Sequence, residues 1–331
     1  MSLERTLNEP IFLNSNATHK SFNTTDIAYI EVEQMMTEDY YVKLFLQNRL
    51  GVNVHNPKII FTSGATESLV TCLNWIKHYY PNRSIIGTNY DHSCVKVNCE
   101  NLDLDYEIID LEELSNENSM KNVSTAVITS VNPETGEILD YELEDINKFE
   151  FVLFDISQAI GKLTLDFSQV ESDYGIYFSL HKIGGRKNCG VLIVNDRNHK
   201  FKPLIAGSQQ EGLRGGTYDL ESCLELPRYV MEYEKLYDRN RYKELWFKFY
   251  EELKEYVVVP TNNHLYNTLL LDFKNVDCIL SKIGLLNEHR IYVTAETSCL
   301  TKKNRNRIRI SYSDVETVEK NFDLIIKLLK A

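Results

Sequence analysis

The sequence lacks a long apolar run and a block of basic residues. None of its segments approaches the roughly 20 apolar residues of a membrane-spanning helix. The first stretch, MSLERTLNEPIFLNSN, has no basic region followed by an apolar core, as a signal peptide would. Acidic residues outnumber basic ones, 48 to 36, for a formal charge of -12, which argues against binding a phosphate backbone. We expect a cytoplasmic protein with neither a membrane nor a nucleic-acid partner.

Paired cysteine motifs are also missing. The chain has 7 cysteines, an odd number, and no two of them form a CxxC pair. A disulfide framework or a zinc ribbon therefore does not fit the sequence. His92, Cys94 and Cys99 lie close together along the chain, but without a fourth ligand they do not make a zinc motif. We expect reduced thiols and no metal site.

The apolar content is instead that of packed cores. With 43% apolar residues over 331 positions, the chain favours one large domain and one smaller domain. The helix TESLVTCLNWIKHYY should bury one face, made of Leu69, Cys72, Leu73, Ile76 and Tyr80. Apolar strands between such helices predict an α/β fold with a mostly parallel sheet buried on both faces. The predicted strands lie in IIFTSGA, SIIGTN, YEIIDL, TAVITS, FVLFDIS, GIYFSL and CGVLIVND.

The pattern changes after about residue 217. Residues 220–256 are charged and helix-periodic, so they predict a helical connector, with Pro227 near a helix start. Beyond it, the sequence predicts strand NTLLLDF, helix VDCILSKIGLL, strands RIYVTAE and RIRISYS, and one final helix. That helix carries an apolar stripe of Val315, Val318, Phe322, Ile325 and Leu329. We predict a large domain at residues 16–222 and a small α+β domain at 1–15 plus 223–331.

Polar residues follow several of the predicted strands, where open parallel sheets bind their ligands. FTSGATES offers backbone amides and the Thr66 hydroxyl at a helix start, which suits a phosphate group. The alternative is that Ser63 or Thr66 simply caps the helix. No GK[ST] follows the glycine, so a nucleotide-binding P-loop is not indicated.

Two more strand ends carry a carboxylate and a lysine. Asp155 ends FVLFD, where a carboxylate needs a cation or hydrogen-bond donors unless it caps the next helix. Lys182 follows another strand beside glycines, and it is either a reactive lysine or a solvated one. A buried lysine can form a Schiff base, an aspartate can pair with a pyridinium nitrogen, and amides with hydroxyls can hold a phosphate. This combination suggests pyridoxal 5'-phosphate.

The motifs FTSGATES, DHSCV, VNPETGEI, FDISQAIGKL, FSLHKIGG and GLRGGT occur in the order and approximate spacing of the class V aminotransferases. Among these, the chain most resembles the NifS/IscS-type cysteine desulfurases, and IFLNSNATH is similar to their opening signature YLDNNATT. The resemblance implies the pyridoxal-phosphate fold type I with a seven-stranded sheet, and a homodimer. It implies conversion of L-cysteine to L-alanine, with the sulfur held as a persulfide for a sulfur-acceptor protein, as in iron–sulfur cluster assembly.

The same resemblance assigns roles to residues of these motifs. Lys182 would form the Schiff base and move protons at the substrate's α-carbon, and Asp155 would keep the pyridine nitrogen protonated. His92 would stack on the ring and serve acid–base steps, and Gln158 would bond the phenolic oxygen. The phosphate would be held by Ala65, Thr66, Ser179, His181 and, from a neighbouring subunit, Thr217.

Two further assignments concern the substrate. Arg309 would pair with the substrate carboxylate through its planar fork, with Arg307 as the alternative. Cys299, in VTAETSC, is similar in position to the cysteine of the family's VSSGSAC and would take the sulfur. Lys302, Lys303 and Arg305 would lower its thiol pKa. The alternative is that Cys299 is a small half-buried residue at a strand end.

The chain departs from the family pattern in places. Pro133 stands where the family has the second asparagine of NNE(T/I)G, and Glu296 replaces a glycine. Only nine residues separate Cys299 from Arg309, which limits how far a persulfide can travel. Two alternatives therefore stay open. One is another class V reaction, that of a selenocysteine lyase or an aminotransferase, and the other is an inactive pyridoxal-phosphate-fold protein that acts as an interaction partner.

Overall fold

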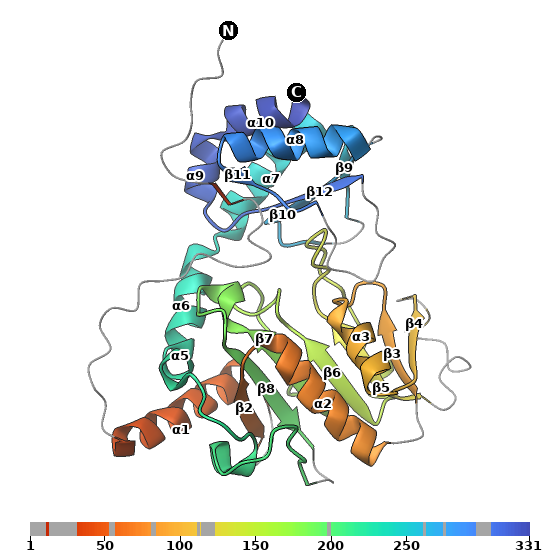
Figure 1. The fold of residues 1–331 in the computed structure, drawn as a ribbon, viewed down its shortest axis with the longest axis vertical. Coiled ribbons are helices and arrows are strands. Elements are labelled where there is room, and N and C mark those ends of the chain that lie inside the picture. The colour runs from red at the N-terminus through yellow and green to blue at the C-terminus, as the bar shows by residue number, and fades with distance from the viewer. Residues whose placement is uncertain are drawn as a thin grey trace.

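A seven-stranded sheet forms the larger of two lobes (Figure 1). The structure is a computed structural model that describes residues 11–12, 32–52, 57–80, 84–110, 113, 123–196, 200–260, 263–273, 276–295 and 306–331. The strand order is β2-β8-β7-β6-β5-β3-β4. Neighbours from β4 to β7 pair in parallel, whereas β8 runs antiparallel to both β2 and β7. The predicted mostly parallel sheet is confirmed.

The elements of this lobe have the following bounds. The strands are β2 (Lys58–Thr62), β3 (Ser84–Thr88), β4 (Tyr106–Ile109), β5 (Val123–Thr129), β6 (Phe151–Asp155), β7 (Asp173–Ser179) and β8 (Gly190–Asn195). The helices are α1 (Val32–Arg49), α2 (Ala65–Tyr79), α3 (Cys94–Asn101), α4 (Leu143–Ile146), α5 (Leu220–Leu224) and α6 (Leu226–Leu236). Two 3-10 helices, η2 (Leu180–Ile183) and η3 (Gln210–Gly212), complete it.

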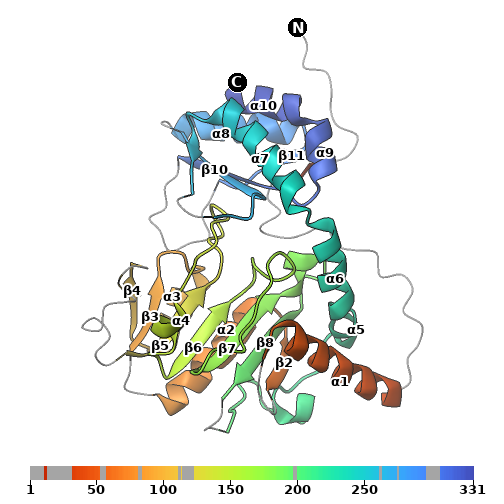
Figure 2. The same ribbon diagram turned by 180° about the vertical axis from the view of Figure 1, so that it is seen from behind.

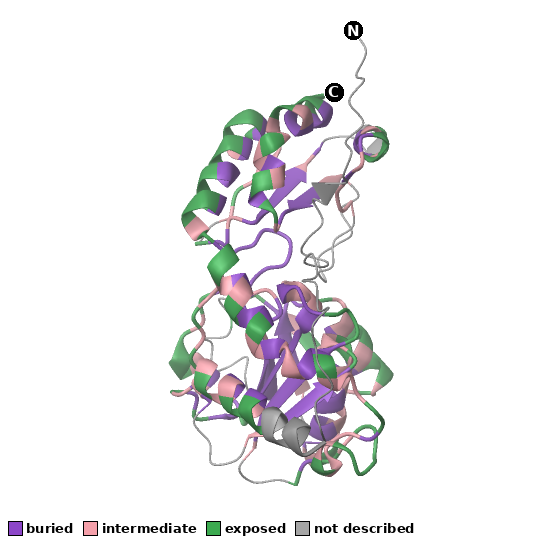
Figure 3. Ribbon diagram, turned by 90° about the vertical axis from the view of Figure 1, so that its left-hand side faces the viewer, coloured by how far each residue is buried: buried purple, intermediate pink, exposed green. Residues whose placement is uncertain are grey.

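Helices cover both faces of the sheet, because successive side chains of a strand point to opposite faces. In β6, Val152 and Phe154 belong to the core shared with α1 and α6, and Phe151 and Leu153 belong to the core shared with α2 and α3. Figures 2 and 3 show the same layering from behind and by burial. The predicted apolar face of α2 is buried, as expected from its spacing, at Leu69, Cys72, Leu73, Ile76 and Tyr80.

The second lobe is built on two smaller sheets, β12-β10-β9 and β1-β11. The pair β1-β11 joins residues 11–12 to residues 291–292 in parallel, so residues 11–12 lie in this lobe. The elements are β1 (Ile11–Phe12), α7 (Arg239–Leu253), β9 (Val257–Val258), β10 (Thr268–Asp272), α8 (Val276–Glu288), β11 (Ile291–Tyr292), β12 (Arg307–Ser311), α9 (Val315–Lys320) and α10 (Phe322–Lys330).

Residues 220–256 form three helices, α5, α6 and α7, which link the lobes (Figure 1). Pro227 lies in the first turn of α6, as predicted. The chain leaves the helix at Tyr237, and the Asp238 carboxylate caps α7 by accepting hydrogen bonds from the amides of Asn240 and Arg241.

Two expectations for the last part of the chain need correction. The final helix is two helices, because Asn321 adopts φ -115° and ψ 13° and its side chain donates to the carbonyl of Thr317 instead of continuing the turn. The strand predicted in RIYVTAE is only β11, followed by a single bridge at Thr294. The domain boundaries at residues 15 and 222 stay a prediction. Among the described residues, no helix is both long and apolar enough to cross a membrane.

Candidate functional site

A cavity of about 320 Å³ lies at the carboxyl ends of β5, β6 and β7, with β12 of the second lobe on its far side. This volume is typical of a small-molecule site. Residues that are distant in the sequence meet there, and most of the predicted site residues are among them. These are Ala65, Thr66, His92, Asp155, Gln158, Ser179, His181, Lys182 and Arg309.

The helix start at one end of the cavity carries no side-chain cap. Gly64 is the N-cap residue of α2, so neither Ser63 nor Thr66 caps the helix as the alternative had it. The Ser179 hydroxyl accepts a hydrogen bond of 2.8 Å from the Ala65 amide and ties β7 to this helix start. Gly190 closes the back of the turn, since a Cβ on it would lie 2.4 Å from the Gly64 carbonyl carbon. A helix N-terminus with hydroxyls nearby suits an anion.

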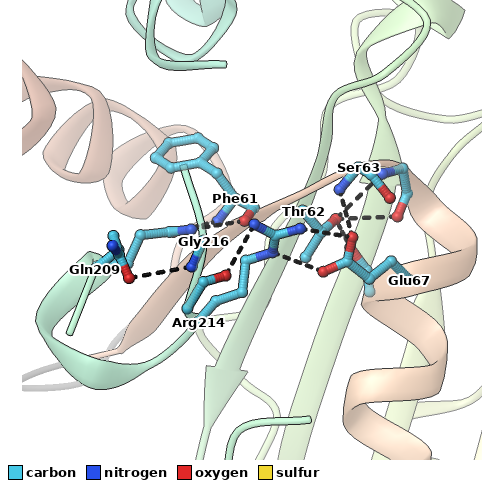
Figure 4. A network of polar contacts seen from close by, with 11 residues as sticks. Phe61, Thr62, Ser63, Glu67, Gln209, Arg214 and Gly216 are labelled. Carbon is cyan, nitrogen blue, oxygen red and sulfur yellow. Dashed lines mark hydrogen bonds and ion pairs between the residues drawn. The ribbon is translucent and has the colours of Figure 1, made fainter. Parts of the chain in front are cut away.

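A polar network fixes the loop before Thr217 to this helix start (Figure 4). Arg214 binds both carboxylate oxygens of Glu67, at 2.7 and 3.1 Å, and Glu67 also accepts the Ser63 amide. Burial opposes the charge of Glu67, but the hydrogen bonds from Arg214 and Ser63 prevail and lower its pKa. The Gln210 side chain pairs with the backbone of Phe61 and so occupies the edge of β2.

Asp155 and Lys182 come from neighbouring strands. The Asp155 carboxylate ends β6 and accepts the Ser157 amide at 2.8 Å. Lys182 lies in η2, directly after β7. Burial lowers the pKa of Lys182 to about 8, and the Arg309 charge acts in the same direction while Asp155 opposes both. The neutral fraction of such a lysine near physiological pH is far larger than that of an exposed lysine, although the charged form still predominates, and the neutral amine is the nucleophile.

His92 has a defined tautomer. Its Nδ1 accepts the backbone N–H of Cys94 at 3.2 Å, so the proton of the neutral ring is on Nε2. The cavity walls desolvate the ring, and together with Lys182 and Arg309 they lower its pKa, although Asp155 acts in the opposite direction. The neutral His92 ring therefore has its hydrogen-bond donor at Nε2.

The residue before His92 anchors this turn. Asp91 is fully buried and accepts hydrogen bonds from the Thr129 hydroxyl (2.6 Å), the Thr88 amide (2.9 Å) and the Tyr106 hydroxyl (3.0 Å). Burial raises the pKa of Asp91 to about 6 in spite of these donors. The contacts join the carboxyl ends of β3 and β5 below His92, which holds its backbone in place.

Arg309 reaches the cavity from the second lobe. Its side chain is only 6% exposed, and Nη1 donates to the Pro133 carbonyl at 3.2 Å. Its backbone forms a bridge with Thr294, with N···O distances of 2.8 and 3.2 Å. Arg307 instead forms an ion pair of 2.9 Å with Asp272 and does not line the cavity. Of the two arginines, Arg309 is the one at the cavity.

The turn with the atypical Pro133 is well ordered by its own contacts. The Asn132 side chain accepts the amides of Glu134 and Thr135, at 2.9 and 3.4 Å, so it is engaged within the turn. The turn extends toward the second lobe, where Ile138 donates to Asn263 at 2.8 Å. The backbone carbonyl of Pro133 accepts from Arg309, and the amide side chain of the family pattern is absent at this position.

Several lining residues were not predicted from the sequence. Thr129 is the last residue of β5, so inspecting every strand end would have identified it, and Tyr177 lies two residues before Ser179 on the same face of β7. Cys94 and Ser157 adjoin predicted residues, but the sequence suggested Cys94 only as a possible zinc ligand and gave no signal for Ser157. The complete unpredicted set is Cys94, Thr129, Val131, Pro133, Ser157 and Tyr177.

Two predicted residues are not in the cavity lining. Thr217 is exposed on the loop that Arg214 fixes, and it does not line the cavity of its own chain. Cys299 lies outside the described residues, as do Glu296, Lys302, Lys303 and Arg305. The described chain ends at Ala295 on one side of this segment and resumes at Asn306 on the other.

Comparison with known sequences identifies similar proteins. The chain is 30% identical over 233 residues to "Cysteine desulfurase IscS" of Ehrlichia chaffeensis, covering 62% of this chain and 55% of that protein. It is 33% identical over 207 residues to "Cysteine desulfurase, mitochondrial" of Drosophila melanogaster, covering 54% of this chain and 44% of that protein. The matched region thus spans about half the length of these curated relatives.

Comparison with solved structures supports the predicted fold, and a family match supports the predicted ancestry. A NifS-like protein superposes with a TM-score of 0.80 at 23% identity, over 97% of this chain and 98% of that one. A NifS-like protein from Rickettsia africae superposes with a TM-score of 0.81 at 20% identity, over 98% and 100%. The fold type I prediction is therefore confirmed.

Residues 46–320, most of the chain, match the family "Aminotransferase class-V". The chain belongs to the class V aminotransferase family.

Proposed function

We propose that this protein is a pyridoxal-phosphate-dependent cysteine desulfurase. The observation that carries the proposal is that Lys182, Asp155 and Arg309 line the same cavity. They bring an amine, a carboxylate and a guanidinium together from η2, β6 and β12. Similarity to proteins named cysteine desulfurase, at 30 to 33% identity in the two relatives described above, favours this activity among the reactions of the family.

The residues of the cavity fit pyridoxal 5'-phosphate. The helix start at Ala65, which lacks a side-chain cap, and the Thr66 hydroxyl suit the phosphate. The buried Ser157 hydroxyl lines the cavity and has no hydrogen-bond partner among the residues that the structure describes, so it is available to a ligand. Asp155 would pair with the ring nitrogen, and Ser179, His181 and Gln158 would complete the contacts. When bound, the cofactor supplies an electron sink for the substrate's α-carbon.

Lys182 and His92 would handle the protons. The lowered pKa of Lys182 lets its amine both accept and return a proton at the α-carbon within the pH range of a cell. His92 would present its Nε2 proton to the cavity, since Nδ1 is engaged by the Cys94 amide.

Arg309 would bind the substrate carboxylate, and Cys299 would take the sulfur. The net reaction is balanced: the thiol of Cys299 and L-cysteine give a Cys299 persulfide and L-alanine. Thr294, five residues before Cys299, is bridged to Arg309, and five extended residues span at most about 17 Å. This tether length supports delivery of the Cys299 thiol to the cavity that Arg309 lines.

A homodimer with shared sites is part of the proposal. Thr217 is exposed, and the same loop exposes Leu204 (38%) and Ile205 (42%), while α1 exposes Tyr40 (62%) and Tyr41 (61%). Apolar side chains of this kind are those that a second copy would cover. Thr217 would then reach the phosphate site of the partner subunit. A protein that accepts sulfur from Cys299 is the expected further partner.

The decisive experiment exposes the cofactor-loaded protein to L-cysteine and analyses its peptides by mass spectrometry. We expect one added sulfur on the peptide with Cys299 and one alanine formed per sulfur transferred. Lys182→Ala should abolish the visible absorption of bound cofactor, whereas the exposed Lys187 of the same loop should be replaceable by alanine without effect. Alanine formation that continues unchanged in Cys299→Ser would contradict the persulfide route and favour another class V reaction.

A further inference from the structure

Lys162 does not line the cavity, but it contacts a residue that does. Lys162 Nζ donates to the Gln158 backbone carbonyl at 3.0 Å and contacts the Gln158 side-chain oxygen Oε1 at 3.3 Å. Gln158 lines the cavity, whereas Lys162 does not. On its other side, the Lys162 ammonium lies 5.7 Å from the centre of the Tyr233 ring of α6. Lys162 therefore connects the helix between the lobes to a residue of the site.

The position is a costly one for a charge. Burial, reinforced by the nearby Lys182 charge, lowers the pKa of Lys162 to about 7. If the side chain served only to fill space, an apolar residue would avoid the free-energy cost of burying an amine. The turn before Lys162 is also tightly packed, since a Cβ on Gly161 would lie 3.2 Å from the Tyr233 ring and 3.3 Å from Ile183. Ile183 directly follows Lys182, so this turn packs against the lysine loop.

We propose that Lys162 is a positioning residue that sets which end of the Gln158 amide faces the cavity. The ammonium form of Lys162, which is present up to about neutral pH, can only donate hydrogen bonds, so the Gln158 oxygen turns toward Lys162. The reversed amide would bring two donor groups together. The Gln158 NH₂ group is thereby directed toward the cavity, as a donor for an anionic oxygen. The inference rests on the proposed function, in which that oxygen is the phenolic oxygen of the cofactor.

The test measures the absorption spectrum of bound cofactor as a function of pH. A donor at the phenolic oxygen stabilises its anion, so its loss raises the pH midpoint of the visible band. We expect Lys162→Met, which keeps the apolar stem, to raise this midpoint by about 1 unit, the size of one weakened hydrogen bond to a charged oxygen. Lys162→Arg, which keeps donors, should restore most of the original value. Lys182, Asp155 and Arg309 remain in all variants.

A double-mutant cycle separates positioning from a direct charge effect. If Lys162 acts through Gln158, Lys162→Met adds no further shift in a Gln158→Ala background. The proposal is overturned if Lys162→Met leaves the midpoint unchanged, or if it shifts the midpoint equally in the Gln158→Ala background. Lys162→Gln takes the place of Lys162→Met if the latter does not fold. A wild-type protein without a cofactor band would refute the proposed function itself, and with it this role for Lys162.

Discussion

Replacing Arg309 by alanine tests the substrate assignment most directly. The side chain is 6% exposed and its Nη1 is 3.2 Å from the Pro133 carbonyl, so its position is defined before any substrate arrives. Breaking a buried ion pair by removing one partner costs about 3–5 kcal/mol. The cavity is open to water, which favours the lower end, and about 3 kcal/mol corresponds to a roughly 150-fold loss of kcat/KM. Most of it should appear as a raised KM for cysteine.

A second consequence of Arg309→Ala concerns Lys182. The Arg309 charge contributes to the low pKa of Lys182, about 8, so its removal should move that pKa upward. The Lys182 amine is then protonated over a wider pH range, and cofactor uptake by the apoprotein should require a higher pH. Uptake followed by visible absorption at a series of pH values measures this shift, separately from turnover.

Arg307→Ala is the matched control, because it lies two residues away on the same strand. Its ion pair with Asp272 is partly exposed and should contribute at most about 1 kcal/mol to stability. We expect kcat/KM to stay within about twofold of wild type, since a surface pair contributes little. A folded Arg309→Ala variant with an unaltered KM for cysteine, or a larger loss in Arg307→Ala, would refute the assignment of the carboxylate to Arg309.

Three further changes probe the frame of the site. Arg214→Lys loses the two-point contact with Glu67 and should lower the free energy of unfolding by about 1 kcal/mol in denaturant titrations. Gly190→Ala drives a Cβ against Gly64 and should cost about 2–3 kcal/mol and weaken cofactor binding. Burial, aided by nearby cations, lowers the pKa of His264 from 6.5 to about 4. Between pH 4 and pH 6.5 the unfolded protein binds a proton at His264 that the folded protein does not. The free energy of unfolding should therefore fall as the pH drops from 6.5 to 4, and His264→Gln should reduce that fall.

Two of these changes, Arg214→Lys and Gly190→Ala, have a control elsewhere in the chain. Arg241→Lys alters an exposed pair with Glu319 and should leave stability nearly unchanged. Gly284→Ala, on the open face of α8, should stabilise the protein by about 0.5–1 kcal/mol. Controls that behave like the site variants would mean that the contacts described for those variants do not carry their effects.

The strand pattern was predictable because it is local. Each of the seven apolar runs that were predicted as strands of the large lobe contains a strand, and the face of α2 with Leu69 and Cys72 is buried as its spacing required. Strand ends carry their ligand residues by sequence adjacency, so the amino-acid order alone is enough to locate Asp155 and Lys182. Local signals also had limits, since the single helix expected at the end of the chain breaks at Asn321. The roles of these residues came from the family motifs.

The sequence by itself determined the fold class and the residues at the carboxyl edge of the sheet, because periodicity and motif order are written along the chain. Only the tertiary structure showed that Arg309, and not Arg307, lines the cavity, since the contact of Arg309 with Pro133 joins residues 176 positions apart. The tertiary structure also determined the tautomer of His92, through the direction of one backbone amide. The orientation of Gln158 toward Lys162 likewise depends on the path of a turn. Such choices depend on three-dimensional distances and burial, which residue types and spacing do not encode.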